Sequence, residues 1–454
     1  MNKSNVISLQ QSVSEKYSSL ARSPSSIKET GVSRAFLNEL VAKHLYENGI
    51  LDLRELVDKV ALEWNVLEEV ISDLRKEALI EVKGPTENTT GLRYSLTDKG
   101  HLFARKAVDK DGYIGYAPVP IEEYRNIIDA QKVHSEIIDK ARLTEVFSGV
   151  VVQEKLLNQL GAAVNSNQAI FVYGPPGTGK SYLCGKLSKV FSSHILIPHA
   201  IYQDGAVVQL YDPALHQAIN YEKPSAENVL KNTFDQRYIL CERPVIVSGG
   251  ELSIDQLEVQ VDHNTKQFHA PLQLKANNGI YIIDDLGRQR VEPKELFNRW
   301  IVPLETQKDY LTVSNGKRME VPFDVVLVFS TNLNPLELAD DAFLRRIGHK
   351  VRFDYIDNEE YVQIWKQVCD EFDVNYSEEN IGYIFNQFYD RFEMPKLPCH
   401  PRDLISMALN HESYECGERK LTNNALRNAW LNYFINMQCV DDEKSAFTYK
   451  FDVV

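Results

Sequence analysis

Residues 174–181 read Gly-Pro-Pro-Gly-Thr-Gly-Lys-Ser, a glycine-rich turn with the spacing G-x-x-x-x-G-K-S. The apolar, β-branched and aromatic residues 169–173 before it predict a buried strand. Residues 180–191 after it predict a helix, because their apolar side chains recur on one face. Backbone N–H groups in such a turn point at an anion, and the helix dipole favours negative charge there. The stretch therefore predicts a cradle for phosphate groups, against the alternative of a βα loop that binds nothing.

A nucleoside triphosphate with Mg²⁺ is the ligand that this spacing fits. Lys180 would reach the β- and γ-phosphates, and the Ser181 hydroxyl would ligate Mg²⁺. The predicted nucleotide-binding residues of the turn are Gly174, Pro175, Pro176, Gly177, Thr178, Gly179, Lys180, Ser181 and Tyr182.

A second motif lies about a hundred residues further on, where the apolar run 280–283 ends in Asp284 and Asp285. A strand that ends in paired acids fits the magnesium and water side of a phosphate site. Asp284 would hold Mg²⁺ through water, and Asp285 would orient or deprotonate the attacking water. Two acids after a strand are common, so the prediction depends on their pairing with the glycine turn.

Three further polar positions complete the pattern. The apolar run 325–329 is followed by a polar end that includes Asn332, which would contact the γ-phosphate and the water. Arg345 and Arg346 close a predicted helix, from which a cation could reach the γ-phosphate held by a neighbouring subunit. The alternative is a solvated arginine pair. Arg402 opens a helix in a later, all-helical segment.

In this order the motifs resemble those of the AAA+ ATPase family, over about residues 143–437. The glycine turn looks like the family's Walker A motif and the acidic strand like its Walker B motif. Asn332 matches sensor 1, Arg345 or Arg346 matches the arginine finger, and Arg402 matches sensor 2. The resemblance implies ATP and Mg²⁺ as ligands and hydrolysis of ATP to ADP and phosphate. A finger that acts in trans implies a ring, most often a hexamer.

Within this family the chain is similar to the branch of MoxR, magnesium chelatase and the sigma-54 activators. Residues 272–287, LQLKANNGIYIIDDLG, place a helix ending in A-N-x-G before the Walker B motif. Residues 295–332 predict a helix, a hairpin that turns at 314–317, and then the sensor strand. Asn-Gly between alternating apolar runs is also a hairpin signal in its own right. We therefore place the chain as MoxR-like.

Two features depart from the family pattern. The second Walker B acid is usually Glu, and Asp285 is one methylene shorter. A misplacement of about 1 Å costs on the order of a hundredfold in rate, so we expect slow hydrolysis or a substitute acid. Residues 192–270 are longer than the family needs and predict inserted strands and loops. Phe268 and His269 could line a central channel or belong to the core of the insert, and we favour the core.

Residues 33–108 predict a small separate domain. A helix closed by Gly49, a second helix N-capped by Asp52, a third helix and a hairpin with a polar tip at 84–91 resemble a winged helix. The helix that would enter a DNA groove is net acidic and carries Glu68, Glu69, Asp73, Arg75, Lys76 and Glu77. An acidic helix is a poor partner for phosphates, so we favour protein docking over DNA binding.

Composition limits the remaining classes. The formal charge of −14 argues against broad nucleic-acid affinity, although a local basic patch stays open. No apolar run approaches the roughly 18 residues that span a bilayer, and the N-terminus lacks the apolar region of a secretory signal. None of the six cysteines has C-x-x-C spacing, and Cys399 beside His400 fits a buried thiol better than a metal ligand. We expect a reduced, cytoplasmic protein.

The predicted fold class is α/β: a P-loop AAA+ core with a parallel sheet and a C-terminal helical lid, preceded by a winged-helix-like domain. The predicted boundaries are a disordered tail 1–32, a winged-helix-like domain 33–108, a linker 109–142, a nucleotide-binding core 143–355 with an insert at about 192–270, a lid 356–440 and a C-terminal tail 441–454. Two functions stay open. One is a ring-forming ATPase that remodels a protein client. The other is an ATP-dependent assembly switch or recruitment scaffold with slow hydrolysis, with nucleic acid as a further open partner.

Overall fold

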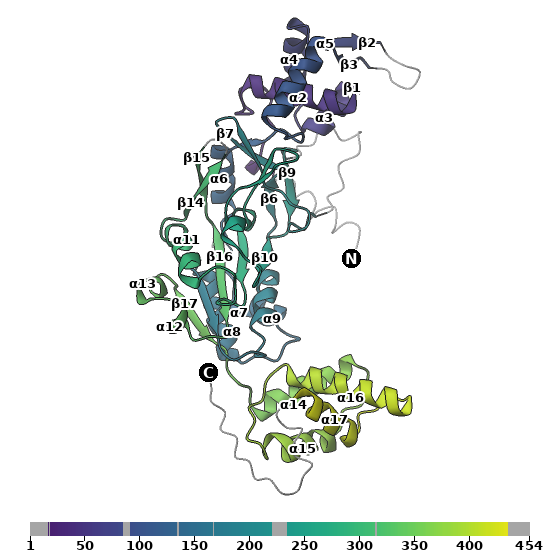
Figure 1. The fold of residues 1–454 in the computed structure, drawn as a ribbon, viewed down its shortest axis with the longest axis vertical. Coiled ribbons are helices and arrows are strands. Elements are labelled where there is room, and N and C mark those ends of the chain that lie inside the picture. The colour runs from purple at the N-terminus through teal and green to yellow at the C-terminus, as the bar shows by residue number, and fades with distance from the viewer. Residues whose placement is uncertain are drawn as a thin grey trace.

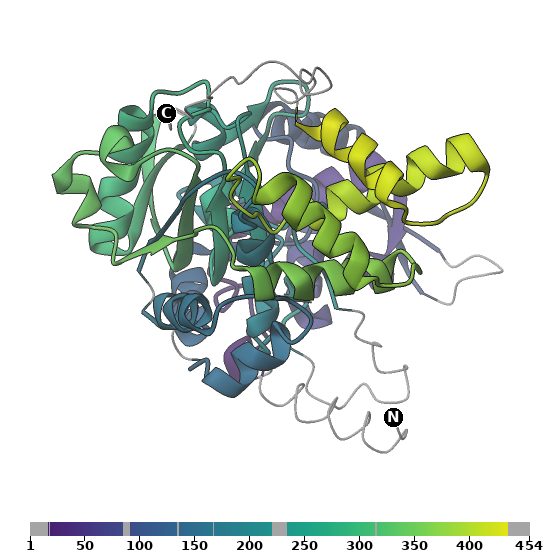
Figure 2. The same cartoon turned by 90° about the horizontal axis from the view of Figure 1, so that it is seen from below.

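The structure is a computed structural model that describes residues 17, 19–84, 91–133, 136–166, 168–219, 234–313 and 316–434. The molecule is elongated, with an N-terminal domain at one end, a mixed middle body, an α/β core and, at the other end, a C-terminal helical domain, for which we keep the predicted name of lid (Figure 1). Viewed from the lid end, the lid helices lie in front of the core (Figure 2). The predicted C-terminal tail and most of the predicted hairpin tip at 84–91 lie outside the described residues.

The N-terminal domain contains the helices and the hairpin that the sequence predicts. Its elements are α2 (Arg34–Asn48), β1 (Ile50–Asp52), α3 (Leu53–Val60), α4 (Trp64–Lys76), β2 (Ile80–Lys83), β3 (Arg93–Leu96) and α5 (Asp98–Lys110). The strands form an antiparallel sheet in the order β1-β3-β2. As predicted, Asp52 caps α3, where its carboxylate accepts a hydrogen bond from the Glu55 amide at 2.8 Å. The assignment of this domain as a winged helix stays a prediction.

The prediction of a disordered tail was wrong for residues 19–32. Ala21, Ile27 and Val32 are buried, and the last two belong to the core of the N-terminal domain. The Thr30 carbonyl oxygen accepts a hydrogen bond from the buried Arg237 guanidinium at 3.1 Å. This Ser-rich segment is ordered despite its polar composition, because its scattered apolar residues each pack into a core. The rest of the tail, residues 1–16 and 18, lies outside the described residues.

The middle body is built from three segments that are distant in sequence. Its elements are β4 (Val119–Pro120), α6 (Ile121–Ala130), β6 (Ile195–Pro198), β7 (Ala200–Gln203), β8 (Ala206–Gln209), β9 (Tyr238–Cys241), β11 (Gln260–Asp262), β12 (Gln267–His269), β14 (Lys308–Val313) and β15 (Lys317–Pro322). One sheet has the order β11-β12-β8-β7-β4, while β6–β9 and β14–β15 are antiparallel pairs. The strands of the predicted hairpin are therefore β14 and β15, although residues 314 and 315 of its turn lie outside the described part.

This body corrects two predicted boundaries. The segment predicted as a linker supplies β4 and α6, and Ile121, Tyr124 and Ile128 of α6 are buried in a core shared with β14 and β15. The segment 192–270 is not wholly an insert, because it contains β10 (Val245–Ser248) of the central sheet. Phe268 packs against the core of the middle body, which agrees with the favoured reading of that residue.

The α/β core is a five-stranded parallel sheet in the order β10-β13-β16-β5-β17. Its other strands are β5 (Ile170–Tyr173), β13 (Gly279–Ile283), β16 (Val325–Thr331) and β17 (His349–Arg352). Side chains alternate along these strands, so Ile170, Ile282 and Val328 pack on one face while Phe171 and Phe329 pack on the other. Both faces are buried, which explains the nearly continuous apolar runs in the sequence.

Helices cover both faces of this sheet. The core helices are α7 (Lys140–Val146), α8 (Glu154–Asn165), α9 (Lys180–Lys186), α10 (Leu272–Lys275), α11 (Pro293–Thr306), α12 (Pro335–Leu338) and α13 (Asp341–Leu344), with 3₁₀ turns at Leu187–Val190 and Ile254–Leu257. The lid contains α14 (Asn358–Glu371), α15 (Glu378–Ile384), a π-helical turn at Phe385–Tyr389, α16 (His400–Cys416) and α17 (Asn423–Tyr433). Trp365, Tyr361, Tyr389 and Trp430 lie in its core.

Candidate active site

The predicted phosphate cradle lies between β5 and α9. Gly174, Gly177 and Gly179 all have positive φ (141°, 78° and 85°), which L side chains rarely adopt. Gly174 has a second constraint, because a Cβ added there would lie 2.1 Å from the carbonyl oxygen of Phe353. The glycines therefore allow the turn to pass close to the end of β17 before α9 begins at Lys180.

Lys180 is the cation of this turn and is 6% exposed. Its Nζ donates hydrogen bonds to the carbonyl oxygens of Gly174 (2.8 Å) and Pro175 (2.7 Å). Burial lowers the pKa of Lys180, while the negative charges of Asp284 and Asp285 act in the opposite direction. The turn and the acidic strand are therefore electrostatic neighbours, although about a hundred residues separate them in the sequence.

The two acids follow β13 and lie beside the end of β16. The Asp284 amide donates to the Ser248 carbonyl oxygen at 2.8 Å, and the Asp284 carboxylate accepts from the Asp285 amide at 3.0 Å. Asp285 has a φ of 49°, in the left-handed region that Asp and Asn tolerate better than most residues. Its Oδ1 accepts a hydrogen bond from Asn332 Nδ2 at 3.2 Å. The structure thus brings three predicted polar residues into contact.

These elements open into one cleft of about 1060 Å³. The predicted residues that line it are Pro176, Gly177, Thr178, Gly179, Lys180, Ser181, Tyr182, Asp284, Asp285, Asn332 and Arg402. Gly174 and Pro175 lie at the start of the turn and hold Lys180. The carboxyl ends of β5, β13 and β16 meet at this edge of the sheet, which is where parallel α/β folds bind ligands.

The sequence reading missed the apolar wall of the cleft. Val150, Val151 and Val152 precede α8, while Ile364 and Val368 come from one face of α14. A planar apolar group such as a nucleobase fits a wall of this kind. Two sequence signals were available: the valine run after Gly149, and the apolar pair at i and i+4 on α14. Neither signal specifies a ligand until the fold brings the two together.

Arg402 reaches the cleft from the start of α16 in the lid. Its guanidinium forms an ion pair with Glu371 at the end of α14, and the side chains are 55% and 54% exposed. The hydrogen bond to Glu371 raises the pKa of Arg402. Glu371 was not predicted, and it also lines the cleft. An exposed pair of this kind contributes about 0–1 kcal/mol, so a phosphate could displace the carboxylate at small cost.

Arg345 and Arg346 do not line this cleft. Both follow α13. Arg346 is engaged within the chain, since its guanidinium donates to the Glu305 carboxylate at 2.6 Å and to the Ala342 carbonyl oxygen at 2.8 Å. The Arg345 side chain is exposed, and no side-chain hydrogen bond or ion pair holds it among the residues that the structure describes. The two arginines are therefore not equivalent.

The groups that would hold Mg²⁺ are the Ser181 hydroxyl and the Asp284 carboxylate, which line the same cleft. Mg²⁺ is commonly bound by one or two protein oxygens together with substrate phosphates and water. The donor set therefore suits Mg²⁺. The glycine turn beside it leaves room for the phosphates.

Cys399 and His400 join the lid to the turn. A Cβ added to Gly177 would lie 2.6 Å from the Cys399 Sγ, so the thiol packs directly on the turn. His400 Nδ1 hydrogen-bonds the Tyr389 hydroxyl at 2.7 Å, and burial lowers the pKa of His400 to about 4. His400 is buried in the lid, whereas Cys399 is only half-buried where the lid contacts the turn, so the predicted buried thiol is only partly buried.

Parts of the chain are similar to known proteins. A family described as a domain of unknown function (DUF8689) matches residues 357–432, which are the lid. The chain is similar to NtrX from Brucella abortus in complex with ADP, with 15% identity over 72% of this chain and a TM-score of 0.37. It spans 65% of that chain. It is also similar to the Thermotoga maritima RuvB Holliday junction branch migration motor, with 13% identity over 66% of this chain and 72% of that chain and a TM-score of 0.34.

With TM-scores this low, the class of the protein rests on its own geometry and not on these two structures. The fold is α/β with a parallel five-stranded sheet, and its candidate site is a cleft at the carboxyl edge, bordered by a glycine turn and a helical lid. No helix in the described ranges is long and apolar enough to cross a membrane.

Proposed function

We propose that the chain is a Mg²⁺-dependent ATPase of the AAA+ class. The observation that carries the proposal is the convergence of four distant segments, around residues 180, 284, 332 and 402, on one cleft. Each segment supplies the residue type that phosphoryl transfer to water needs at that place. The similarity to MoxR-like proteins in the sequence supports the same class.

Each residue has a definite role in the proposed reaction. The backbone amides of the turn and Lys180 hold the β- and γ-phosphates. Ser181, and Asp284 through water, would hold Mg²⁺, which would supply positive charge against the charge that develops on the phosphates. Asp285 accepts a proton from the attacking water. Asn332 orients the Asp285 carboxylate toward that water through its hydrogen bond to the carboxylate. Hydrolysis gives ADP and phosphate.

The lid and a neighbouring subunit complete the site in this proposal. Arg402 leaves Glu371 and contacts the nucleotide phosphates. Arg345 acts in trans as the arginine finger of a ring, for which a hexamer is the expected form. Its lack of a partner among the described residues supports it over Arg346, which is held by Glu305.

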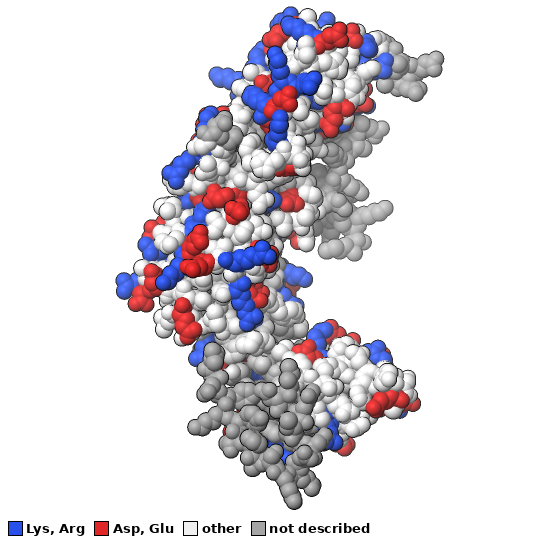
Figure 3. Space-filling model, in the orientation of Figure 1, with Lys and Arg blue, Asp and Glu red and all other residues white. Residues whose placement is uncertain are grey.

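A protein client is the expected partner of the N-terminal domain. On α4, Glu69 and Asp73 pair with Arg34, and Asp73 also pairs with Lys76. On the face seen in Figure 3, basic and acidic side chains are interspersed. Both observations support a protein partner over nucleic acid, and the proposal is that this partner is a client that the ATPase remodels.

The second candidate function is an ATP-dependent assembly switch with slow hydrolysis. The short acid Asp285 favours this alternative, because its carboxylate reaches less far than the usual Glu. Steady-state turnover with and without a partner separates the two functions. A remodelling ATPase turns over continuously, whereas a switch binds ATP, assembles and hydrolyses it slowly.

The test of the site is Lys180→Ala, measured by calorimetry with ATP and Mg²⁺. The variant should lose nucleotide binding, because Lys180 is the only cation of the turn. Lys189→Ala is the matched control, since Lys189 lies outside the cleft and the change of charge is the same. An unchanged dissociation constant in Lys180→Ala would contradict the proposed site.

A further inference from the structure

The turn that carries Asp285 has an unusual backbone. Asp285 and Gly287 have positive φ values of 49° and 98°. The Arg288 amide donates to the Asp285 carbonyl oxygen at 3.0 Å, so residues 285–288 form a tight turn. A left-handed conformation is uncommon in residues other than glycine and needs support from the surrounding structure. The direction of the Asp285 carboxylate therefore depends on the groups that hold this turn.

The neighbouring strands hold the residues on either side of Asp285. The Asp284 amide donates to the Ser248 carbonyl oxygen of β10 at 2.8 Å. The Leu286 amide donates to the Ser330 carbonyl oxygen of β16, also at 2.8 Å. Both bonds join backbone to backbone, so the sheet itself anchors the turn at two points. The remaining polar groups of the turn have to be satisfied by other parts of the chain.

Gln289 satisfies two of these remaining groups with one carboxamide. Its Oε1 accepts a hydrogen bond from the Gly287 amide at 2.8 Å, and its Nε2 donates to the Asp284 carbonyl oxygen at 2.9 Å. Nε2 also donates to the Gly249 carbonyl oxygen, which follows β10, at 3.4 Å. The half-buried side chain thus bridges the residue before Asp285 to the residue two places after it.

Gln289 reaches the reaction through Asp285 and not through the nucleotide, because it is not among the residues that line the cleft. Asn332 holds the same acid from its other end, where its Nδ2 donates to the Asp285 carboxylate at 3.2 Å. Gln289 therefore holds the backbone of the acid, while Asn332 holds the carboxylate. Both constraints matter for a base, since its carboxylate has to come within about 2.6–3.2 Å of the water.

We propose that Gln289 is a positioning residue for the ATPase reaction, which sets the place of the Asp285 carboxylate by holding its turn. This inference rests on the proposed function, because it requires Asp285 to be the base. Asp has a short reach, so the place of its backbone decides whether its carboxylate meets the water. A carboxamide suits this position because it offers both an acceptor and a donor, whereas an ionised Glu offers acceptors alone.

Gln289→Met tests the positioning, because it keeps the length of the side chain and removes both hydrogen bonds. Phosphate release at saturating ATP and Mg²⁺ gives kcat, and calorimetry gives the dissociation constant for ATP. We expect kcat to fall by roughly tenfold or more, since a misplacement of about 1 Å costs on the order of a hundredfold. The dissociation constant should stay within about twofold, because Gln289 lies outside the cleft. Gln289→Glu keeps the acceptor for the Gly287 amide and loses the donor, so its kcat should lie between the two.

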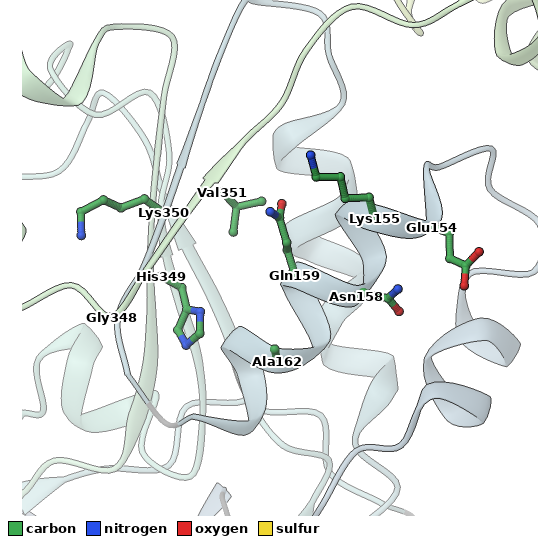
Figure 4. Close-up of a pocket in the computed structure, with 9 residues that line it drawn as sticks. All are labelled: Glu154, Lys155, Asn158, Gln159, Ala162, Gly348, His349, Lys350 and Val351. Carbon is green, nitrogen blue, oxygen red and sulfur yellow. The ribbon is translucent and has the colours of Figure 1, made fainter.

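Two matched controls make the same change elsewhere. Gln131 is also a buried carboxamide that bridges backbone groups: its Nε2 donates to the Leu196 carbonyl oxygen at 3.1 Å, and its Oε1 accepts from the Leu196 amide at 2.7 Å. Gln131→Met should lower the melting temperature and leave kcat unchanged, because Leu196 belongs to β6 of the middle body. Gln159 of α8 lies in a groove between α8 and β17 and does not line the cleft (Figure 4). Gln159→Met should change neither quantity.

The outcomes separate this inference from the proposed function. No turnover in the unaltered chain, or unchanged turnover in Asp285→Asn, contradicts the proposed function itself. If Asp285→Asn abolishes turnover while both Gln289 variants turn over like the unaltered chain, the positioning role alone is wrong. A similar loss of kcat in Gln131→Met, or ATP binding that weakens in Gln289→Met as much as kcat falls, would also overturn the role, because the effect would then be one of general stability. If Gln289→Met does not fold, Gln289→Glu decides the outcome.

Discussion

Asp285→Glu is the substitution that most sharply tests the proposed chemistry. Asp285 has a φ of 49° and accepts a hydrogen bond from Asn332 at 3.2 Å. A left-handed backbone suits Asp, whose short side chain can bond locally, better than Glu. Glu would also advance the carboxylate by one C–C bond, about 1.5 Å, into the space of the attacking water. A site built around Asp should therefore work less well with the longer acid.

The size of the effect follows from the displacement. Because a 1 Å misplacement costs on the order of a hundredfold, we expect kcat to fall by roughly ten- to a hundredfold in Asp285→Glu. That range corresponds to about 1.4–2.7 kcal/mol of lost transition-state stabilisation. The dissociation constant for ATP should stay the same, since the phosphates are held by the glycine turn and Lys180 rather than by Asp285.

Phosphate release at saturating ATP and Mg²⁺ measures this change, and calorimetry gives the dissociation constant. Asp285→Asn is the matched variant, because Asn also tolerates a left-handed backbone but its amide cannot accept the proton. It should abolish turnover and preserve ATP binding and ATP-driven assembly. Turnover that holds or rises in Asp285→Glu would refute the argument from the backbone. Turnover like that of the unaltered chain in Asp285→Asn would place the base elsewhere.

Three further predictions concern the interface, the partner and the lid. Arg345→Ala should abolish ATPase activity without loss of ATP binding, and mixing it with Lys180→Ala should restore some activity at hybrid interfaces. If no mixing ratio restores activity and the mass under ATP is monomeric, the site is not shared between subunits. Arg346→Ala should change the free energy of unfolding by about 1 kcal/mol or less, because it removes a partly exposed ion pair. The full chain should not shift duplex DNA at sub-micromolar concentration in physiological salt, and a shift that requires residues 33–108 would overturn the expected protein partner. Burial holds the pKa of His400 at about 4, so only the unfolded state takes up a proton as the pH falls from about 6.5. The free energy of unfolding should therefore fall by about 1.4 kcal/mol per pH unit through this range, and His400→Gln should remove that part of the slope in denaturant titrations.

The sequence predicted the polar residues of the site because parallel sheets bind ligands at the carboxyl ends of their strands. Lys180, Asp284 and Asn332 each follow an apolar run, and the carboxyl ends of such runs meet at one edge. Position along the chain was therefore enough to group them. The apolar wall follows no such rule, because Val151 and Ile364 meet only when the lid folds against the core.

The middle body could be predicted only in part: the β14–β15 hairpin is local, but other pairings of this body join strands that are distant in sequence. β4 pairs in parallel with β7, and β8 pairs in parallel with β12, each across a long intervening segment. A two-residue strand such as Val119–Pro120 has no periodicity to detect. β10 was missed because its partner β13 is also distant in sequence, and local patterns could not distinguish β10 from the strands of the insert. Likewise, nothing local indicated that Asp285 has a left-handed backbone.

The segment predicted as a linker in fact fixes the N-terminal domain to the rest of the molecule. Lys43 is 1% exposed in its side chain and forms an ion pair with Asp111 at 3.5 Å, while its Nζ also donates to the Tyr113 carbonyl oxygen at 3.3 Å. Phe36 packs on Tyr202 of β7 at 5.1 Å between ring centroids. Removing one partner of a buried ion pair typically costs about 3–5 kcal/mol, so loss of Lys43 or Asp111 should weaken the attachment of this segment to α2. If the N-terminal domain binds a partner, as proposed, the packing of Phe36 on Tyr202 would hold that partner close to the middle body. The β14–β15 hairpin of that body leads directly into β16, and β16 ends at the proposed catalytic Asn332.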